Sequence, residues 1–363
     1  MPSRGTFAFS PTPVLMSLPR RIAFATALVL VARPLVAQAP EGLWYATNAE
    51  TSVQSFLAHA DRIAIVAPQA FALDSTGVVT GRIDPRIVAK AREANVKLVP
   101  LIVNPSFDQA VFHRVLVTAT ARANAVRNIT ALCRDNRFHG IQFDFENIAV
   151  TDRDALTAFS REVADSLHAI GCSISAAVVP RSSEDRGPTA YHQWMFDNWR
   201  GAYDFKALAD AMDYLSLMTY SQHTRRTPPG PVAGYPWMEA AVKYLLSLGV
   251  APARISLGLP AYSQRWSTAY DAQAGARVAG NSLTFLAASG WLTKSGVQPT
   301  WDPRQKEAYA FWENDGLFEW IFLQDARAFD ARLGLMRQYG LRGYSVWVLG
   351  QEDPKVWELP GVR

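Results

Sequence analysis

The chain has 363 residues, 49% of them hydrophobic and 11% aromatic, which is enough apolar material for one large buried core. Its formal net charge is +4, but the excess lies in the first 39 residues, which hold four arginines and no acidic residue. Subtracting these four from the 36 basic residues leaves 32, equal to the 32 acidic residues of the rest of the chain. Because this remainder is neutral, we expect neither nucleic acid nor an anionic membrane as a partner.

The first 39 residues have the three parts of an export signal. Basic residues precede a largely apolar run at 22–32, and Val-Ala-Gln-Ala at 36–39 fits a small-residue cleavage site. The run is shorter than the roughly 20 residues that a membrane-spanning helix needs, although an uncleaved anchor is the alternative. We expect cleavage after Ala39, giving a secreted or periplasmic mature chain of residues 40–363 that is free of the membrane and monomeric.

Short apolar runs rich in β-branched and aromatic residues recur after residue 40, with helical segments between them. Asp84 followed by Pro85 marks the start of one helix, and Thr151 with Asp154 resembles a capping box. Strands that alternate with helices pair in parallel through right-handed crossovers, and eight of them close a (β/α)8 TIM barrel. The runner-up is an open doubly wound sheet, but no glycine-rich phosphate turn follows the first strand. The predicted strands are 43–46, 63–67, 97–103, 140–145, 173–179, 214–220, 255–261 and 344–349.

The stretch between the seventh and eighth predicted strands is unusually long and rich in aromatic residues. A βα unit does not need so many residues, so we predict a small α+β insertion subdomain at about residues 265–320. Most of its aromatic residues are expected to form its own core, and one or two could line a sugar groove. These aromatic residues are Trp266, Tyr270, Trp291, Trp301, Tyr309, Phe311, Trp312 and Trp320.

The two cysteines, Cys133 and Cys172, each lie just before a predicted strand. After export they could meet at one end of the sheet and form a disulfide, and two buried free thiols are an equal alternative. Neither has a histidine or cysteine neighbour at the spacing of metal ligands. We therefore expect no zinc site, and no other feature of the sequence calls for a cofactor.

The most informative segment is His-Gly-Ile-Gln-Phe-Asp-Phe-Glu at residues 139–146. Side chains alternate along a strand, so Gln142, Asp144 and Glu146 share one face and three apolar residues share the other. Burying an unpaired carboxylate is unfavourable, so the face with two carboxylates is expected to line a solvated cleft. In a TIM barrel the active site is built at the carboxyl ends of the strands, which is where these carboxylates lie.

Two other predicted strands end with groups that suit a sugar. The sixth turns Met218 and Tyr220 to one side, and the eighth turns Trp347 inward. An indole stacks on the apolar face of a sugar ring, and paired acids serve proton transfer to a glycosidic oxygen. Taken singly, each signal has a plain alternative, such as a core tryptophan or an ion-paired carboxylate. Together they predict one pocket around Asp144 and Glu146.

These motifs resemble those of glycoside hydrolase family 18, the chitinase-like family, over nearly the whole mature chain. Residues 140–146 resemble the acidic strand of that family, and residues 217–220, 257–262 and 343–350 resemble its sixth, seventh and eighth strands. Four more segments resemble the branch of bacterial spore-cortex and cell-wall N-acetylglucosaminidases. They are residues 179–183, 203–205, 318–320 and 324–327.

The resemblance implies a substrate-assisted retaining mechanism, in which the 2-acetamido oxygen of the substrate attacks the anomeric carbon. Glu146 would be the general acid and later the base, and needs a raised pKa. Asp144 would hold the acetamido N–H and stabilise the oxazolinium-like cation, and Tyr220 would bond the acetamido carbonyl. Trp347 would form the floor of the subsite for the reacting sugar. The other residues expected to bind substrate there are Gln142, Met218 and Tyr45.

The chain departs from the family pattern at three positions. His139 and Gln142 stand where the family has aspartates, and Ser221 stands where an acid is common. Gln142 can hydrogen-bond Asp144 without adding charge, so the like-charge contribution to the pKa values of Asp144 and Glu146 should be smaller. From this we predict a pH optimum on the acidic side.

The sequence thus predicts a secreted glycosidase that hydrolyses β-1,4 bonds in a polymer containing N-acetylglucosamine, with peptidoglycan as the first choice and chitin-type oligosaccharide as the second. The alternative is a catalytically weak chitinase-like carbohydrate-binding protein, since the lectins that the chain also resembles keep the barrel and lose the acid. Retention of Asp144 and Glu146 favours the enzyme. A metal-dependent hydrolase or deacetylase would need a clustered set of histidines and aspartates that the sequence lacks.

Overall fold

The computed structural model describes residues 5–13 and 40–362, apart from residues 272 and 274. The chain divides into two compact units, Met1–Gln38 and Ala39–Arg363. In the first unit, residues 5–13 contain no helix or strand, and most of the predicted export signal lies outside the described residues. No helix in the described part of the chain is long and apolar enough to cross a membrane.

Eight parallel strand positions close into a barrel in the second unit. Each strand pairs with its neighbours along the chain, and the first pairs with both the second and the last, which closes the ring. The predicted (β/α)8 fold and its eight strands are confirmed, with the third position split into two short strands. In ring order the strands are β1 (Glu41–Ala46), β2 (Ile65–Leu73), β4 (Lys97–Leu98) with β5 (Leu101–Val103), β6 (Gly140–Asp144), β7 (Ser173–Val178), β8 (Tyr214–Leu217), β9 (Ile255–Pro260) and β15 (Gly343–Trp347), and a short β3 (Val79–Gly81) pairs antiparallel with β2.

Helices follow the strands and cover the outside of the barrel. Asp84 caps the helix that follows it by accepting a hydrogen bond from Arg86 N–H at 2.8 Å, as predicted. The predicted capping box at Thr151 and Asp154 is wrong, because a 3-10 turn at Val150–Asp152 precedes that helix and no side chain caps it. The helices are α1 (Glu50–His59), α2 (Pro85–Glu93), α3 (Gln109–Val117), α4 (Ala119–Asn136), α5 (Arg153–His168), α6 (Ala190–Met195), α7 (Phe205–Ala211), α8 (Tyr235–Ser247) and α10 (Ala326–Gln338).

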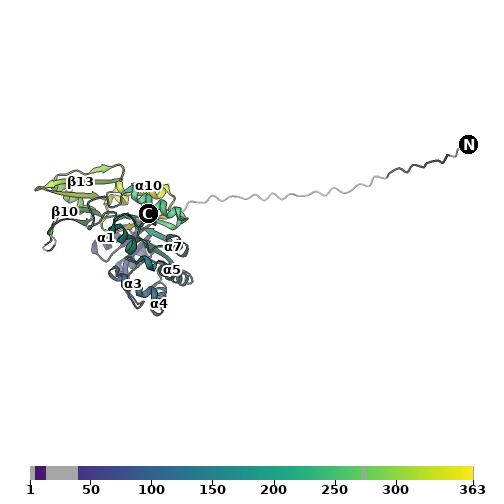
Figure 1. Cartoon of the computed structure of the whole chain (residues 1–363), viewed down its shortest axis with the longest axis horizontal. Coiled ribbons are helices and arrows are strands. Elements are labelled where there is room, and N and C mark those ends of the chain that lie inside the picture. The colour runs from purple at the N-terminus through teal and green to yellow at the C-terminus, as the bar shows by residue number, and fades with distance from the viewer. Residues whose placement is uncertain (1–4, 14–39, 272, 274, 363) are drawn as a thin grey trace. The chain divides into compact units, whose positions relative to one another are not determined.

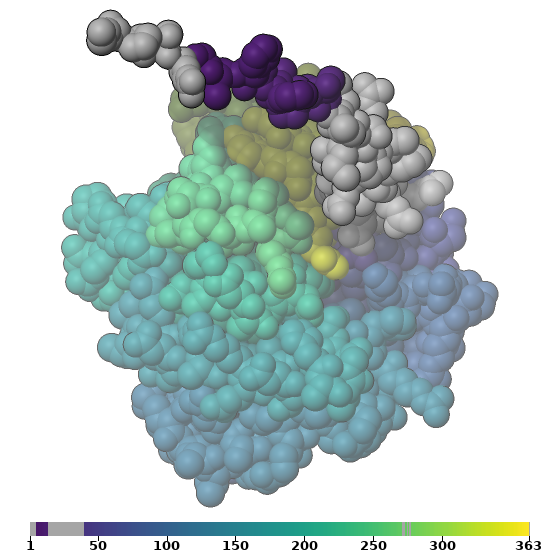
Figure 2. All heavy atoms as spheres, turned by 90° about the vertical axis from the view of Figure 1, so that its right-hand side faces the viewer, coloured from purple at the N-terminus to yellow at the C-terminus, as the bar shows by residue number. Residues whose placement is uncertain are grey.

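The main core lies between the outer face of the barrel and these helices. On β6 the outward rings continue into the helical layer: Phe143 stacks on Phe159 of α5 at 5.8 Å, and Phe145 stacks on Phe112 of α3 at 4.1 Å. Full burial of each such ring contributes about 1.5–3 kcal/mol. Figure 1 shows α3, α4, α5 and α7 together on the side away from β10 and β13, and Figure 2 shows the blue-to-green residues of this part of the chain making up most of the visible face.

A second, smaller core fills the interior of the barrel. It consists of inward residues from β1, β2, the third strand position and β8, and of the residue that follows β15. Inward and outward residues therefore alternate on the strands, and the predicted alternation on β6 is confirmed. The interior residues are Leu43, Tyr45, Ile65, Ala67, Val99, Leu101, Tyr214 and Val348, with Trp347 packed against them.

Between β9 and β15 the chain forms a five-stranded antiparallel sheet with one helix, here called the insertion sheet. Its strand order is β11-β10-β14-β13-β12, and in Figure 1 its long strands project from the barrel on the side away from α3 and α4. The elements are β10 (Ser263–Asp271), β11 (Gly275–Leu283), α9 (Phe285–Ser295), β12 (Thr300–Asp302), β13 (Glu307–Asn314) and β14 (Leu317–Leu323).

The two faces of the insertion sheet differ. Helix α9 packs on one face, where Leu292 meets Ala310 and Ile321. Cross-strand partners share a face of an antiparallel pair, so Trp320, which neighbours Ile321, lies on the other face with its partner Phe311. The rings on this second face, which α9 leaves uncovered, are Trp266, Tyr309, Phe311, Phe318, Trp320 and Phe322.

Most of the predicted aromatic residues of the insertion have partners within it. Trp266 is fully buried against Phe322, and the guanidinium of Arg265 lies 3.9 Å from the ring centre of Trp291. Phe311, in contrast, is 57% exposed. Core formation therefore accounts for most of these rings, and part of the uncovered face remains open to a ligand.

Cys133, in α4, and Cys172, just before β7, form a disulfide with their Cα atoms 6.7 Å apart. The sequence left this pairing open. The bond closes a loop between residues 39 positions apart, and a cross-link of that span stabilises a fold by about 3–4 kcal/mol through its restriction of the unfolded chain. It lies at the amino ends of β6 and β7, away from the carboxyl ends where the predicted site lies.

Candidate active site

Asp144 and Glu146 lie at the carboxyl end of β6. Asp144 is the last residue of the strand and is 4% exposed, and Glu146 lies two residues further on and is partly exposed. Burial raises the pKa of Asp144 to about 6. Burial, and after it the neighbouring charge of Asp144, raises the pKa of Glu146 well above its ordinary value. The pair therefore keeps a proton at a pH where an exposed glutamate has lost it.

Gln142 lies beneath this pair and does not donate to Asp144, which corrects the sequence prediction. It is fully buried, and its amide donates to Ser175 Oγ at 2.9 Å and to Ser216 Oγ at 3.1 Å. Gln69 of β2 donates to Asp144 Oδ2 instead, at 3.4 Å. Because Gln142 has no open surface, the structure makes it part of the support under the carboxylates.

The acidic pH optimum predicted from Gln142 does not follow from this arrangement. The missing negative charge at position 142 is only one of the influences on these pKa values. Burial is the first cause of the raised pKa for both Asp144 and Glu146, and it depends on the tertiary fold. Since burial raises the pKa of Glu146, the arrangement favours an optimum at a higher pH than the count of charges alone predicts.

Glu146 lies beyond the regular strand, and two side chains hold the peptide groups on both sides of it. Asn104 is fully buried; its Oδ1 accepts from Glu146 N–H at 3.0 Å and its Nδ2 donates to the Glu146 carbonyl at 2.9 Å. From another direction, Tyr203 Oη donates to the Phe145 carbonyl at 2.7 Å. These bonds satisfy main-chain groups that the sheet no longer pairs. The direction of the Glu146 side chain therefore depends on Asn104 and Tyr203.

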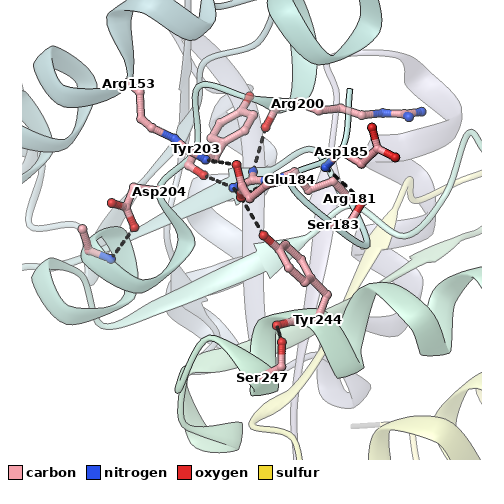
Figure 3. Close-up of polar contacts among 11 residues, drawn as sticks. Arg153, Arg181, Ser183, Glu184, Asp185, Arg200, Tyr203, Asp204, Tyr244 and Ser247 are labelled. Atoms are coloured by element: carbon pink, nitrogen blue, oxygen red, sulfur yellow. Dashed lines mark hydrogen bonds and ion pairs between the residues drawn. The ribbon is translucent and has the colours of Figure 1, made fainter. Parts of the chain in front are cut away.

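Tyr203 is anchored in turn by the buried Arg181 (Figure 3). Arg181 donates to the Tyr203 carbonyl and to the Arg200 carbonyl, both at 2.8 Å, and to Glu184 at 2.6 Å. Glu184 also accepts from Tyr244 Oη at 2.6 Å. Although burial acts the other way, the hydrogen bonds from Tyr244 and Arg181 lower the pKa of Glu184 to about 2. This ion pair stays charged at working pH and keeps the segment that carries Tyr203 in place.

Met218 and Tyr220 follow β8. Thr219, fully buried between them, donates to a carbonyl of β9 at 2.7 Å and fixes this segment against the barrel. Burial raises the pKa of Tyr220 well above its usual value, and the neighbouring Tyr45 and the two carboxylates raise it further. The phenol of Tyr220 therefore lies near the carboxyl pair and remains a hydrogen-bond donor. Met218 is only 7% exposed and offers little surface to a ligand.

Trp347 is the last residue of β15, and its ring lies 5.4 Å from that of Tyr45 on the adjacent β1. Tyr45 is 1% exposed and belongs to the interior core, so it supports the indole from inside the barrel. Trp347 itself is partly exposed, and the peptide bond that follows it is cis. The indole can therefore offer a flat apolar surface to a sugar, whereas Tyr45 cannot be reached from outside.

The arrangement brings together four of the predicted residues, Asp144, Glu146, Tyr220 and Trp347, and places Gln142 and Tyr45 beneath them. His139 lies at the opposite, amino end of β6, where its Nδ1 accepts from Leu98 N–H at 3.2 Å. Within the described residues, no group of three or more His, Cys, Asp or Glu side chains is placed to hold a metal ion. The side chains gathered here are a buried acid, a neighbouring carboxylate, a phenol and an indole. Such a set can serve proton transfer.

Comparisons with known proteins identify the family of this chain. The family model for glycosyl hydrolases family 18 matches residues 43–352. The putative sporulation-specific glycosylase YdhD of Bacillus subtilis is 26% identical over 67% of this chain and 54% of its own length, and the cortical fragment-lytic enzyme of the same organism is 26% identical over 70% and 57%. The chain thus spans little more than half the length of these two relatives. A chitinase from Chromobacterium violaceum superposes with a TM-score of 0.78 at 26% identity, over 88% of this chain and 97% of that one.

Proposed function

Because the chain belongs to glycosyl hydrolases family 18 and is a glycoside hydrolase, we propose that it cleaves β-1,4 bonds of a glycan that contains N-acetylglucosamine, with peptidoglycan as its polymer. The observation that carries this proposal is the carboxyl pair at the end of β6. Glu146 has a raised pKa and lies beside Asp144, with Tyr220 and Trp347 at the same end of the barrel. An acid that keeps its proton to a higher pH than an exposed glutamate suits the protonation of a glycosidic oxygen.

In the proposed reaction, the 2-acetamido oxygen of the substrate attacks the anomeric carbon while Glu146 transfers its proton to the leaving oxygen. Asp144 accepts a hydrogen bond from the acetamido N–H, and its charge stabilises the oxazolinium-like cation. Tyr220 donates to the acetamido oxygen, and Trp347 carries the sugar ring. Glu146, now ionised, takes a proton from the water that opens the cyclic intermediate, so the configuration at the anomeric carbon is retained.

The choice of peptidoglycan is supported by the relatives. Two of them are named for sporulation and for the lysis of cortical fragments, and both match the chain over more than three-fifths of its length. The chitinase among the solved structures makes chitin-type oligomers the second substrate to test.

We also propose that the mature chain works outside the cytoplasm. The basic and apolar leader supports this, and so does the disulfide between Cys133 and Cys172, since such bonds persist in oxidising compartments. Mass spectrometry of the exported protein is expected to show a chain that begins at residue 40. Protein that is recovered outside the cell with residues 1–39 still attached would contradict cleavage.

The test of the activity compares the release of reducing ends by the wild type and by Glu146→Gln, from peptidoglycan strands and from N-acetylglucosamine oligomers. An amide cannot donate the catalytic proton, so kcat is expected to fall about 10²–10⁴-fold on both substrates. Glu93→Gln, the same substitution at an exposed position at the end of α2, is the matched control and should keep full activity. Equal release by the wild type and Glu146→Gln would leave only a carbohydrate-binding protein. Full activity after treatment with a chelator is expected, because no step uses a metal.

A further inference from the structure

A polar cavity of about 420 Å³ lies between the barrel and the insertion sheet. Ser221 and Tyr262, from the segments after β8 and β9, line its barrel side, and their hydroxyl oxygens are 2.6 Å apart. Ser221 directly follows Tyr220, and the Tyr262 phenol is close enough to affect the pKa of Tyr220. The cavity therefore adjoins the proposed catalytic groups.

Arg225 is the one charged residue among those that line this cavity. The other side chains of the lining carry hydroxyl or amide groups, and none is acidic. Arg225 is exposed, and within the described part of the chain its guanidinium has no ion pair or hydrogen bond. Two acids of the neighbouring strands are already paired, Glu319 with Arg265 and Glu307 with Arg332. The cavity thus has a net positive charge and no internal partner for it.

The backbone of Arg225 is fixed against the insertion sheet. Gln264, 3% exposed, donates to the His223 carbonyl at 2.9 Å and accepts from Arg225 N–H at 3.1 Å. Trp266 Nε1 donates to a carbonyl of the same loop at 3.2 Å. Gly280 allows the close approach, because a Cβ there would lie 3.0 Å from the Arg225 Cα. A loop held in this way presents its cation to a ligand with little further loss of conformational entropy.

We propose that this cavity binds a carboxylate carried by the peptidoglycan strand, with Arg225 as the recognising cation, and that it makes the enzyme prefer peptidoglycan to chitin. This inference rests on the function proposed above. A guanidinium bonds a carboxylate through two parallel N–H···O contacts, and the hydroxyl and amide groups of Ser221, Thr224 and Asn281 supply further donors.

The alternation of sugars in peptidoglycan fits this placement. When N-acetylglucosamine occupies the reacting subsite, both of its neighbours on the strand are N-acetylmuramic acid. Each of these carries a lactyl ether whose carboxylate is free or is extended by a stem peptide with carboxylates of its own. Chitin has no carboxylate, so Arg225 gains no ionic contact with it.

Binding and cleavage are to be measured separately, so that this inference and the proposed function can fail separately. Binding is measured by calorimetry in a Glu146→Gln background, with and without Arg225→Gln. The ligands are glycan strands stripped of stem peptides by an amidase, strands that keep them, and N-acetylglucosamine oligomers of equal length. Arg226→Gln is the matched control, since this exposed arginine is adjacent in sequence but does not line the cavity.

Arg225→Gln is expected to weaken binding of carboxylate-bearing strands about tenfold, the effect of one charge-assisted contact, and to change binding of the oligomers less than about twofold. A loss on stripped strands assigns the contact to the lactyl carboxylate, and a loss confined to stem-bearing strands assigns it to a peptide carboxylate. Arg226→Gln should change neither. Equal effects of Arg225→Gln on all three ligands, or no effect on any, would overturn the inference even if the wild type cleaves peptidoglycan. Failure of the wild type to cleave any of these glycans, with the Arg225-dependent preference intact, would overturn the proposed function instead.

Discussion

The carboxyl end of β6 and the insertion sheet meet at the same end of the barrel but are built in different ways. At β6 the carboxylates are largely buried, and the fully buried Asn104 and the hydroxyl of Tyr203 fix the main chain that carries Glu146. On the insertion sheet one face is left open by α9, and Arg225 stands at its cavity without a partner among the described residues.

This difference indicates a division of labour. Side chains that are buried and held in place can stabilise the charge that develops in the transition state. Open surface and unpaired donors favour contacts made equally with the bound substrate and the transition state, which lower KM without raising kcat. Substitutions at the end of β6 are therefore expected to change kcat, and substitutions on the insertion sheet to change KM or substrate preference.

The largest effect beyond the loss of Glu146 is expected from Asp144→Asn. The amide keeps the size of the side chain but removes the charge that, in the proposed reaction, stabilises the oxazolinium-like cation. We expect kcat on N-acetylglucosamine oligomers to fall about 10²–10³-fold, the usual cost of lost electrostatic stabilisation. Steady-state kinetics measure this, with Asp135→Asn at an exposed site on α4 as the control. A near-normal kcat for Asp144→Asn would remove Asp144 from the mechanism.

A smaller effect, also at the carboxyl end of β6, is expected from substitution of the two residues that position Glu146. Tyr203→Phe keeps the ring and loses the bond to the Phe145 carbonyl, so kcat should fall about tenfold with KM nearly unchanged, because small misplacements of a reacting group are costly. Asn104→Ala loses both bonds to the main chain of Glu146, and kcat should fall about 10²-fold. Tyr244→Phe belongs to the same network as Tyr203 but does not contact the end of β6. Tyr244→Phe should leave kcat unchanged. A fall in kcat equal to that of Tyr203→Phe would show that both substitutions act by disturbing the fold.

The pH profile of kcat/KM tests the buried charges directly. In the proposed reaction Asp144 acts when ionised, and its pKa is raised to about 6, so activity should rise as pH increases through that value. Glu146 acts when protonated, and its pKa is raised well above the ordinary value by burial and then by Asp144, so activity is lost only at higher pH. Below pH 6 the rate should change about tenfold per pH unit. Gln142→Asp should move this acid limb upward, and full activity of the wild type at pH 4 would contradict the assignment.

The smallest effect is expected on the open face of the insertion sheet. Trp320→Ala removes a ring from that face, and loss of one aromatic contact of about 0.5–1.5 kcal/mol should raise KM roughly two- to tenfold with kcat unchanged. Leu286→Ala is the control, because this residue is 67% exposed and lies on α9, which packs on the opposite face. A reduced kcat for Trp320→Ala would contradict the proposed division of labour.

Local patterns in the sequence were sufficient to predict the barrel and the strand that carries the two carboxylates. The period-2 alternation of residues 139–146 predicted the inward carboxylates, and eight β-rich runs predicted the closed sheet. The partners Gln69, Asn104 and Tyr203 were not predicted as site residues, because they bond to β6 and its extension across 75, 42 and 58 positions of the chain. Gln69 did carry a local signal, since it shares the inward phase of β2 with residues 65 and 67.

The pKa values of the carboxyl pair could not be predicted from the local sequence as the strand could. The expected effect of Gln142 on the pKa of Glu146 counted like charges, whereas the first cause is burial, which depends on how the barrel and its loops enclose the pair. The cavity at Arg225 likewise depends on a loop after β8 docking on β10 and β11, which are remote in sequence. Contacts of this kind leave no periodic trace in the sequence.

The central claim is that Glu146 donates the proton while the acetamido group of the substrate supplies the nucleophile. The most direct test is proton NMR of the first sugar released from an N-acetylglucosamine oligomer, recorded before mutarotation. Double displacement through the acetamido group predicts that the β anomer forms first and that the α anomer follows only at the rate of mutarotation. Initial release of the α anomer would show direct attack by water and would contradict the account.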